Sequence, residues 1–162
     1  LALDALKGFL PVVVALWLSP QFGIGAGTVA AVGLAAFVGH LWPLFFRFKG
    51  GKGVATAAGV LMAFNPLLGV ATLATWAIVA LFFRYSSLAS IAAAVFAPFY
   101  QALIWDADVY ALAISAMSLL LVWRHEGNIR KLLAGTESKL GQKPAPAAAH
   151  HAAAHQHKGH HR

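Results

Sequence analysis

The sequence predicts an all-α fold, a polytopic membrane helix bundle with six spans. Hydrophobic residues make up 60% of the chain and charged residues only 10%, with a mean hydropathy of +0.72, unlike an ordinary soluble domain. Several windows approach the roughly 17–25 apolar residues that a bilayer crossing needs. These windows are Ala/Leu/Val/Ile runs without period-two alternation, and a helix satisfies its own backbone hydrogen bonds inside lipid.

Six helical spans are expected in the first 123 residues. They cover residues 4–18, 26–46, 54–64, 67–83, 88–105 and 109–123. The third span is short for a full crossing, and Asn65-Pro66 separates it from the fourth. We therefore expect that helix to be tilted or to cross where the protein is thin.

The cations predict an orientation for these spans. If the spans alternate, none of the twelve Lys and Arg residues falls on the side of connections 19–25, 65–66 and 106–108. By the positive-inside tendency, the basic side and both chain ends are cytoplasmic.

The composition divides the chain into a membrane-embedded domain, residues 1–138, and a cytoplasmic tail, residues 139–162. The tail consists mainly of Ala, Pro, Gln, Lys and His and contains six of the eight His residues. It cannot form a core, so we expect disorder without a physiological metal role. The chain has no Cys, which excludes disulfides and thiol catalysis.

The loop Gly50-Gly51-Lys52-Gly53, between the second and third spans, is a candidate anion site. Glycines let backbone N–H groups converge, and the next helix adds unpaired amides and the positive end of its dipole. Lys52 adds a full charge. The G-x-x-x-x-G-K-[ST] spacing of a Walker A loop is absent. The alternative interpretation is a flexible basic turn between two membrane helices.

A second polar cluster follows the last span. If that helix continues to Asn128, His125 and Asn128 share a face at i, i+3, and Arg124 and Asn128 share one at i, i+4. The alternative for His125 is an interfacial histidine with a satisfied ring. Arg130 and Lys131 suit lipid headgroups equally well.

A third cluster, Arg84 with Ser86, Ser87 and Ser90, lies between the fourth and fifth spans. Ser86 or Ser87 would serve as a helix cap under the simpler interpretation. Ser90 lies one turn inside the helix, where serine more often bonds back to its own backbone.

The fourth cluster is Asp4 with Lys7, whose i, i+3 spacing also fits a local ion pair. The four clusters offer cations, hydroxyls, an amide and an imidazole on one face, but few carboxylates: Asp4, Glu126 and Glu137. This balance favours an anionic substrate. It argues against paired-carboxylate hydrolysis and against a metal site, because no H-x-x-x-H or acidic pair is present.

Four motifs stand along the chain with hydrophobic spacers between them: Asp4-x-x-Lys7-Gly8 with Pro11, Gly39-His40-x-x-Pro43 through Phe48-x-Gly50-Gly51-Lys52-Gly53-Val54-Ala55-Thr56, Arg84-Tyr85-x-Ser87-Leu88-x-Ser90, and His125-x-x-Asn128-Ile129-x-x-Leu132-x-x-Gly135-x-Glu137. In this order, the motifs resemble the acyl-phosphate-dependent glycerol-3-phosphate acyltransferases of bacterial phospholipid synthesis, the PlsY family. The resemblance covers residue 1 to about residue 139.

The resemblance implies a seven-helix enzyme of the bacterial inner membrane whose active site faces the cytoplasm. Such an enzyme transfers a fatty acyl group from acyl phosphate to the sn-1 hydroxyl of glycerol 3-phosphate, giving lysophosphatidic acid and phosphate. Its partners would be these two substrates and the bilayer, with no cofactor and no nucleic acid. The chain departs from the family pattern by lacking the first helix and the glycine-rich loop after it, which includes a functional Ser and Arg. An inactive fragment therefore remains an alternative.

An acyl phosphate is already activated, so the site needs to hold two anions and stabilise developing charge without a covalent acyl-enzyme. We expect phosphate to be bound by Gly50, Gly51, Lys52, Gly53, Ser87 and Arg84. The catalytic set would be His125, Asn128, Ser90 and Lys52, supported by Asp4, Lys7, His40 and Glu137. His125 would position the nucleophile or accept its proton, unless a substrate phosphate accepts that proton. Which phosphate the loop holds stays open.

The residues argue against one other function and one other acyltransferase mechanism. A transporter or channel for an anionic phosphorylated solute needs polar groups near the bilayer midplane. The spans are Ala/Leu/Val/Phe-rich there, which favours an interfacial enzyme. The H-x-x-x-x-D motif of the other large acyltransferase class is excluded, because Phe45 and Arg130 occupy the acidic position after His40 and His125.

Overall fold

The computed structural model describes residues 1–42 and 50–142, and all regular secondary structure within them is α-helical. The predicted disordered tail lies outside the described residues from 143 onward. Seven helices are present in the described part: α1 (Ala2–Phe22), α2 (Ala26–Leu41), α3 (Val54–Phe64), α4 (Pro66–Phe83), α5 (Ser86–Trp105), α6 (Val109–Arg124) and α7 (Glu126–Leu133).

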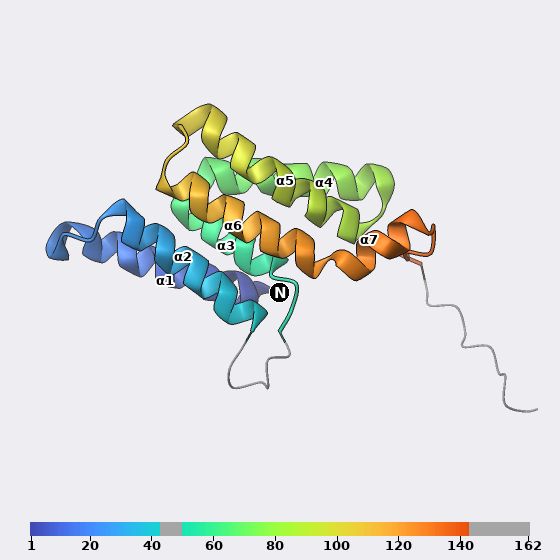
Figure 1. Ribbon diagram of the computed structural model, residues 1–162, viewed down its shortest axis with the longest axis horizontal. Helices are drawn as coiled ribbons and strands as arrows, with labels where there is room; N and C mark the ends of the chain where they lie inside the picture. The colour runs from blue at the N-terminus through green and yellow to red at the C-terminus, as the bar shows by residue number, and fades with distance from the viewer. Residues whose placement is uncertain (43–49, 143–162) are drawn as a thin grey trace, which may run out of the picture.

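The first six helices run up and down in sequence, and the short α3 lies among α1, α2, α4 and α6 (Figure 1). The N-terminus, the start of α3, the α4–α5 connection and α7 gather toward one end of the bundle, while the α1–α2 and α5–α6 connections lie toward the other (Figure 1). The alternation on which the charge argument rests is therefore present in the fold.

Glycines allow α1 and α3 to pack with their backbones in contact. A Cβ on Gly59 would collide with the carbonyl oxygen of Ala5, and one on Gly8 with the carbonyl oxygen of Thr56. Lipid supplies no hydrophobic driving force between helices, so such close approach is how membrane helices gain packing energy.

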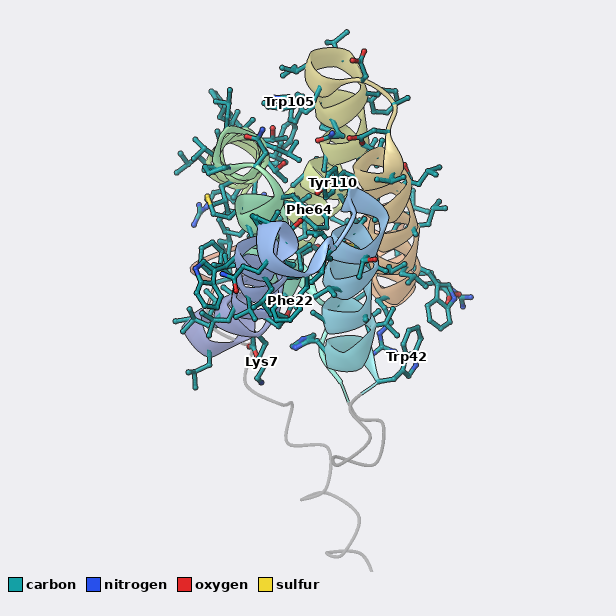
Figure 2. The ribbon with its side chains drawn as sticks, turned by 90° about the vertical axis from the view of Figure 1, so that its left-hand side faces the viewer. Lys7, Phe22, Trp42, Phe64, Trp105 and Tyr110 are labelled. Carbon is teal, nitrogen blue, oxygen red and sulfur yellow. The ribbon has the colours of Figure 1, made fainter. Side chains whose placement is uncertain are left out.

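The centre of the bundle is filled by apolar side chains, and large apolar side chains also cover its outside. Phe37, Leu41 and Leu68 are fully buried. The rings of Phe64 and Tyr110 meet with centroids 4.9 Å apart (Figure 2). The exposed large side chains include Leu81, Phe82, Leu103, Leu112 and Leu119. An apolar exterior of this extent suits hydrocarbon rather than water.

A proline explains where α4 begins. Pro66 begins α4 at a position that needs no N–H donor, and the Asn65 side chain accepts from the amides of Leu67 and Leu68 at 2.9 and 3.4 Å. This confirms the predicted break between the third and fourth spans.

The prediction that the second span continues to residue 46 is wrong at Trp42, because α2 ends at Leu41. Trp42 leaves the helical region with φ −128° and ψ 70°. It precedes a proline, and proline disfavours the helical conformation in the residue before it.

Three helices, α1, α4 and α5, are long and apolar enough to cross a membrane. The shorter apolar helices α2, α3 and α6 have 16, 11 and 16 residues. The six-span count therefore stays a prediction, as does the cytoplasmic assignment of the polar end.

Candidate functional site

The loop before α3 has the geometry that an anion site requires. Gly53 has a left-handed φ of +81°, and a Cβ there would collide with the Phe37 ring and lie 2.8 Å from Cδ1 of Leu41. Glycine is therefore needed on both conformational and steric grounds. The first bond of the helix runs from the Ala57 amide to the Gly53 carbonyl at 2.8 Å. The three amides before it have no partner within the helix, so their N–H groups are available to an anion.

Four of the predicted site residues form one hydrogen-bonded network, which we call the Lys52 network: Lys52, Asn128, Glu137 and Ser87. Lys52 Nζ donates to Asn128 Oδ1 at 2.6 Å. Asn128 Nδ2 donates to Glu137 Oε1 at 2.7 Å, and Ser87 Oγ donates to the same oxygen at 2.6 Å. The fold thus joins the loop before α3, the first turn of α5, α7 and the segment after α7.

Glu137 is the negative end of this network. Its partial burial raises the pKa, but hydrogen bonds from Ser87 and Asn128 and the charges of Lys131 and Lys52 outweigh burial and hold the pKa below its ordinary value of 4.5. The carboxylate is therefore ionised at neutral pH. It fixes the Asn128 amide with its nitrogen toward Glu137 and its oxygen toward Lys52, so the lysine ammonium is held at the loop.

His125 is buried, with 2% of its surface exposed. Its Nδ1 lies 2.8 Å from the carbonyl oxygen of Leu121, so Nδ1 carries the proton and Nε2 is the free acceptor. Burial lowers the pKa of His125 and the charge of Lys52 lowers it further, against opposing effects of the Leu121 bond and Glu137. The ring is satisfied at Nδ1, as the simpler interpretation expected, and its neutral form is favoured.

The helix of the last predicted span does not continue to Asn128. Helix α6 ends at Arg124, His125 caps it, and α7 begins at Glu126. The amides of Asn128 and Ile129 both bond to the His125 carbonyl at 2.9 Å. Asn128 therefore reaches Lys52 from a separate helix, α7, and does not share one continuous helix with Arg124.

Ser90 bonds back to its own helix, donating to the Ser86 carbonyl at 2.8 Å, as the simpler interpretation predicted. Its oxygen also accepts from Trp76 Nε1 at 3.1 Å. No hydrogen bond within the described residues joins Ser90 to the Lys52 network. Tyr85 is the residue that precedes α5, without a side-chain cap, so neither Ser86 nor Ser87 serves as the cap.

Arg84 is directed to the chain segment after α7 rather than to the loop. Its Nη2 donates to the Leu140 carbonyl at 2.9 Å, while the Leu140 amide donates to the Arg84 carbonyl at 2.6 Å. Its role in phosphate binding stays a prediction that this contact does not support.

The supporting residues of α1 and α2 meet beside the loop. Asp4 Oδ1 lies 3.2 Å from Lys7 Nζ, which confirms the local ion pair, and 3.8 Å from His40 Nδ1. On the other side of the ring, a Cβ on Gly51 would lie 2.6 Å from His40 Nε2. Asp4 and His40 therefore connect α1 to the glycine loop.

Sequence reasoning missed two residues. Arg124, considered only for its helix face, places Nη2 3.3 Å from the carbonyl oxygens of both Gly50 and Gly51. Thr56 is fully buried, and its hydroxyl has no hydrogen-bond partner within residues 1–42 and 50–142. The family motif ending in Thr56 was the available signal for that residue, whereas no pattern joins Arg124 to carbonyls more than 70 residues away.

An apolar cavity of about 540 Å³ opens beside this site, between α1, α3, α4, α5 and α6. Its walls include Phe9, Val54, Met62, Leu73, Ala94 and Met117. Ser90 and Leu121 also line it, so the cavity reaches the residue whose carbonyl orients His125. Its size is within the usual range of small-molecule sites.

The glycerol-3-phosphate acyltransferase family model matches residues 1–135, most of the chain. The chain belongs to the glycerol-3-phosphate acyltransferase family. A family member from Paraburkholderia phymatum is 58% identical over 149 residues, covering 91% of this chain and 71% of that protein. A second, from Paraburkholderia phytofirmans, is 60% identical over 140 residues, covering 86% of this chain and 65% of that protein. The chain thus spans about two thirds of the length of these relatives.

Crystal structures of the family member PlsY, an integral membrane glycerol 3-phosphate acyltransferase, have the same fold. Its lysophosphatidic acid form superposes with a TM-score of 0.79 at 38% identity, covering 86% of this chain and 69% of that one. The glycerol 3-phosphate form gives the same TM-score and identity. The all-α membrane bundle and the family resemblance are confirmed.

Proposed function

We propose that this protein transfers a fatty acyl group from acyl phosphate to the sn-1 hydroxyl of glycerol 3-phosphate, giving lysophosphatidic acid and inorganic phosphate. One observation carries the proposal: the Lys52 network holds an ammonium, next to an apolar cavity, beside glycine-loop amides that have no partner in the described part of the chain. The names of the family members support glycerol 3-phosphate as the acceptor.

The charge balance supports two phosphorylated substrates. Lys52 has three N–H donors and uses one on Asn128, which leaves two for a phosphate. The α3 N-terminus adds amides and the positive end of the helix dipole. The apolar cavity offers space for the hydrocarbon chain of an acyl phosphate, whose charged head would then lie at the polar site.

In the reaction, the hydroxyl oxygen of glycerol 3-phosphate attacks the acyl carbonyl carbon and the bond from that carbon to the phosphate oxygen breaks. Phosphate departs with the bonding electron pair. The hydroxyl proton passes to Nε2 of His125 or to a substrate phosphate; the unprotonated Nε2 and lowered pKa suit His125 for this step. Lys52 and the loop amides stabilise the charge that develops on the oxygens.

We also place the protein in the bacterial inner membrane, with the Lys52 network at the cytoplasmic face. The one-sided Lys and Arg residues support this orientation. The start of α3, α7 and the N-terminus also lie toward one end of the bundle (Figure 1). In Figure 2, Lys7 and Trp42 lie far from Trp105, as this arrangement requires.

The test is to incubate purified protein in detergent with acyl phosphate and labelled glycerol 3-phosphate. Lysophosphatidic acid and phosphate should appear in equal amounts, and acyl-CoA and acyl carrier protein should not replace the donor. The assay is run on the 162-residue chain and on that chain joined to the part by which its relatives are longer.

Lys52→Ala should remove most of this activity while the protein still inserts. The matched control, Lys131→Ala, deletes an exposed cation of α7 at the same end of the bundle and should stay active. Product formed only from acyl-CoA would refute the proposed donor. Full turnover by Lys52→Ala would refute the role of the loop.

A further inference from the structure

Arg124, in the last turn of α6, contacts the backbone of the glycine loop rather than an acidic side chain. Its Nη2 donates to the carbonyl oxygens of Gly50 and Gly51, both at 3.3 Å. Within residues 1–42 and 50–142, no carboxylate pairs with its guanidinium. Arg124 Nε is buried without a described partner. Leaving a buried N–H group without a partner has an energetic cost.

The two contacts determine where the loop amides point. In a trans peptide group the C=O and the following N–H point in opposite directions. When Arg124 draws the Gly50 and Gly51 carbonyls toward itself, the N–H groups of Gly51 and Lys52 point away from it. Neither amide donates to another described residue. Within residues 1–42 and 50–142, both are therefore unpaired donors beside the α3 N-terminus.

The end of α2 packs closely against the same turn. A Cβ on Gly50 would collide with the carbonyl oxygens of His40 and Leu41, and one on Gly51 would lie 2.6 Å from the His40 ring. The Cα atoms of the turn are therefore packed closely against the end of α2. A flip of a peptide plane would leave these Cα atoms in place, and the bonds from Arg124 Nη2 to the two carbonyls oppose such a flip.

We propose that Arg124 is a positioning residue that orients the Gly51 and Lys52 amides to bind the phosphate of a substrate. It acts through the two carbonyls and does not touch the substrate. The inference rests on the proposed phosphate-binding function of the loop, and the experiment separates the two.

The test measures one peptide group by NMR. Gly51-Lys52 is the only Gly-Lys pair in the sequence. Protein labelled with ¹³C on glycine carbonyls and ¹⁵N on lysine therefore gives a single HNCO peak, which reports the Gly51 carbonyl and the Lys52 amide together. Spectra are recorded for wild type and Arg124→Gln, with and without glycerol 3-phosphate or inorganic phosphate. Arg130→Gln is the matched control, because it removes an exposed arginine of α7 with the same change in charge.

Without ligand, Arg124→Gln should move the peak by more than its linewidth or broaden it, while Arg130→Gln leaves it in place. On titration, wild type and Arg130→Gln should show a saturable shift, and Arg124→Gln should need at least tenfold more phosphate. An unmoved ligand-free peak in Arg124→Gln overturns the inference, even if phosphate binds. If the wild-type peak does not shift on titration with phosphate, the proposed function of the loop is refuted instead. The ligand-free spectra then still test whether Arg124 orients the Gly51–Lys52 peptide group.

Arg124→Lys covers the case in which Arg124→Gln fails to fold. Lysine keeps the charge, but its compact ammonium on a flexible stem does not reproduce the planar, pre-oriented guanidinium from which Nη2 makes both contacts. It should give an intermediate peak position and, in the acyl transfer assay, raise KM for glycerol 3-phosphate more than it lowers kcat. Wild-type values of both the peak position and KM in Arg124→Lys would contradict the inference.

Discussion

Replacing Glu137 with glutamine tests whether the Lys52 network depends on charge. The substitution keeps the side-chain shape and an acceptor oxygen but removes the negative charge. In the wild type, the charged carboxylate accepts hydrogen bonds from Ser87 and Asn128 at 2.6 and 2.7 Å. A neutral acceptor holds the Asn128 amide, with its nitrogen toward residue 137, less strongly than a carboxylate does. Lys52 then loses its fixed position at the loop.

The magnitude follows from the two hydrogen bonds. A bond to a charged group contributes about 1.5–3 kcal/mol and a neutral one about 0.5–1.5 kcal/mol, so each loses about 1 kcal/mol. Glu137 is only partly buried, and solvent screening reduces the total to about 1–2 kcal/mol. Glu137→Ala leaves both donors without this acceptor and should cost about 2–3 kcal/mol, because water replaces the carboxylate incompletely.

The assay is reversible unfolding in mixed micelles, followed by circular dichroism and read as a free energy of unfolding. Glu126→Gln is the control, because it neutralises an exposed carboxylate that pairs with Arg130 within α7. That pair should contribute no more than about 0.5 kcal/mol. If Glu137→Gln is no less stable than Glu126→Gln, the carboxylate does not hold the network together and the charge argument fails.

Three further predictions follow. The pKa of Glu137 in the folded protein lies below its ordinary value of 4.5, so its contribution to stability is complete above pH 4.5 and is lost as pH falls through the folded pKa. In an acid titration, the free energy of unfolding of the wild type should therefore show a decrease that Glu137→Gln lacks. Gly59→Ala should destabilise the protein by about 1–3 kcal/mol in the same unfolding assay, because the new methyl group collides with the Ala5 carbonyl. As a control, the methyl group of Gly27→Ala in α2 would contact no described atom, so this substitution should be neutral or slightly stabilising. As a general base, His125 must be neutral, and its lowered pKa places the acid limb of the kcat/KM profile below pH 6.5. His125→Gln should reduce the rate of acyl transfer about 10²–10⁴-fold. An unchanged pH–rate profile in this variant would exclude His125 as the base.

Much of the fold was predictable because lipid leaves the chain few choices. Apolar runs had to be helices, and Asn65-Pro66 had to interrupt them. The end of α2 was placed too late, although Pro43 was visible in the sequence as a reason for an earlier stop. The break at His125 had no such signal, since no Pro or Gly stands at that position to end the helix.

The site was predictable as a set of residues rather than as a set of contacts. One-sided clustering selected Lys52, Ser87 and Asn128, and the family motifs added Glu137, because both depend on residue type and order. Two of the three contacts join residues 50 and 76 positions apart, beyond the reach of any local periodicity, and the third joins residues 9 positions apart. Arg124 was missed for a different reason: its acceptors are backbone carbonyls, which every residue possesses, so residue type carries no information about them.

The first turns of α5 show how the apolar and polar parts of the site are brought together. Ser87 and Ser90 lie at i, i+3 on one face, separated by about 4.5 Å along the helix axis. Ser87 bonds to Glu137 in the Lys52 network, whereas Ser90 lines the apolar cavity. One helical turn therefore spans the boundary between the region suited to a phosphate and the region suited to a hydrocarbon chain. In an acyl phosphate the reacting carbonyl carbon is the atom that joins those two parts, so the proposed reaction would take place at this turn of α5.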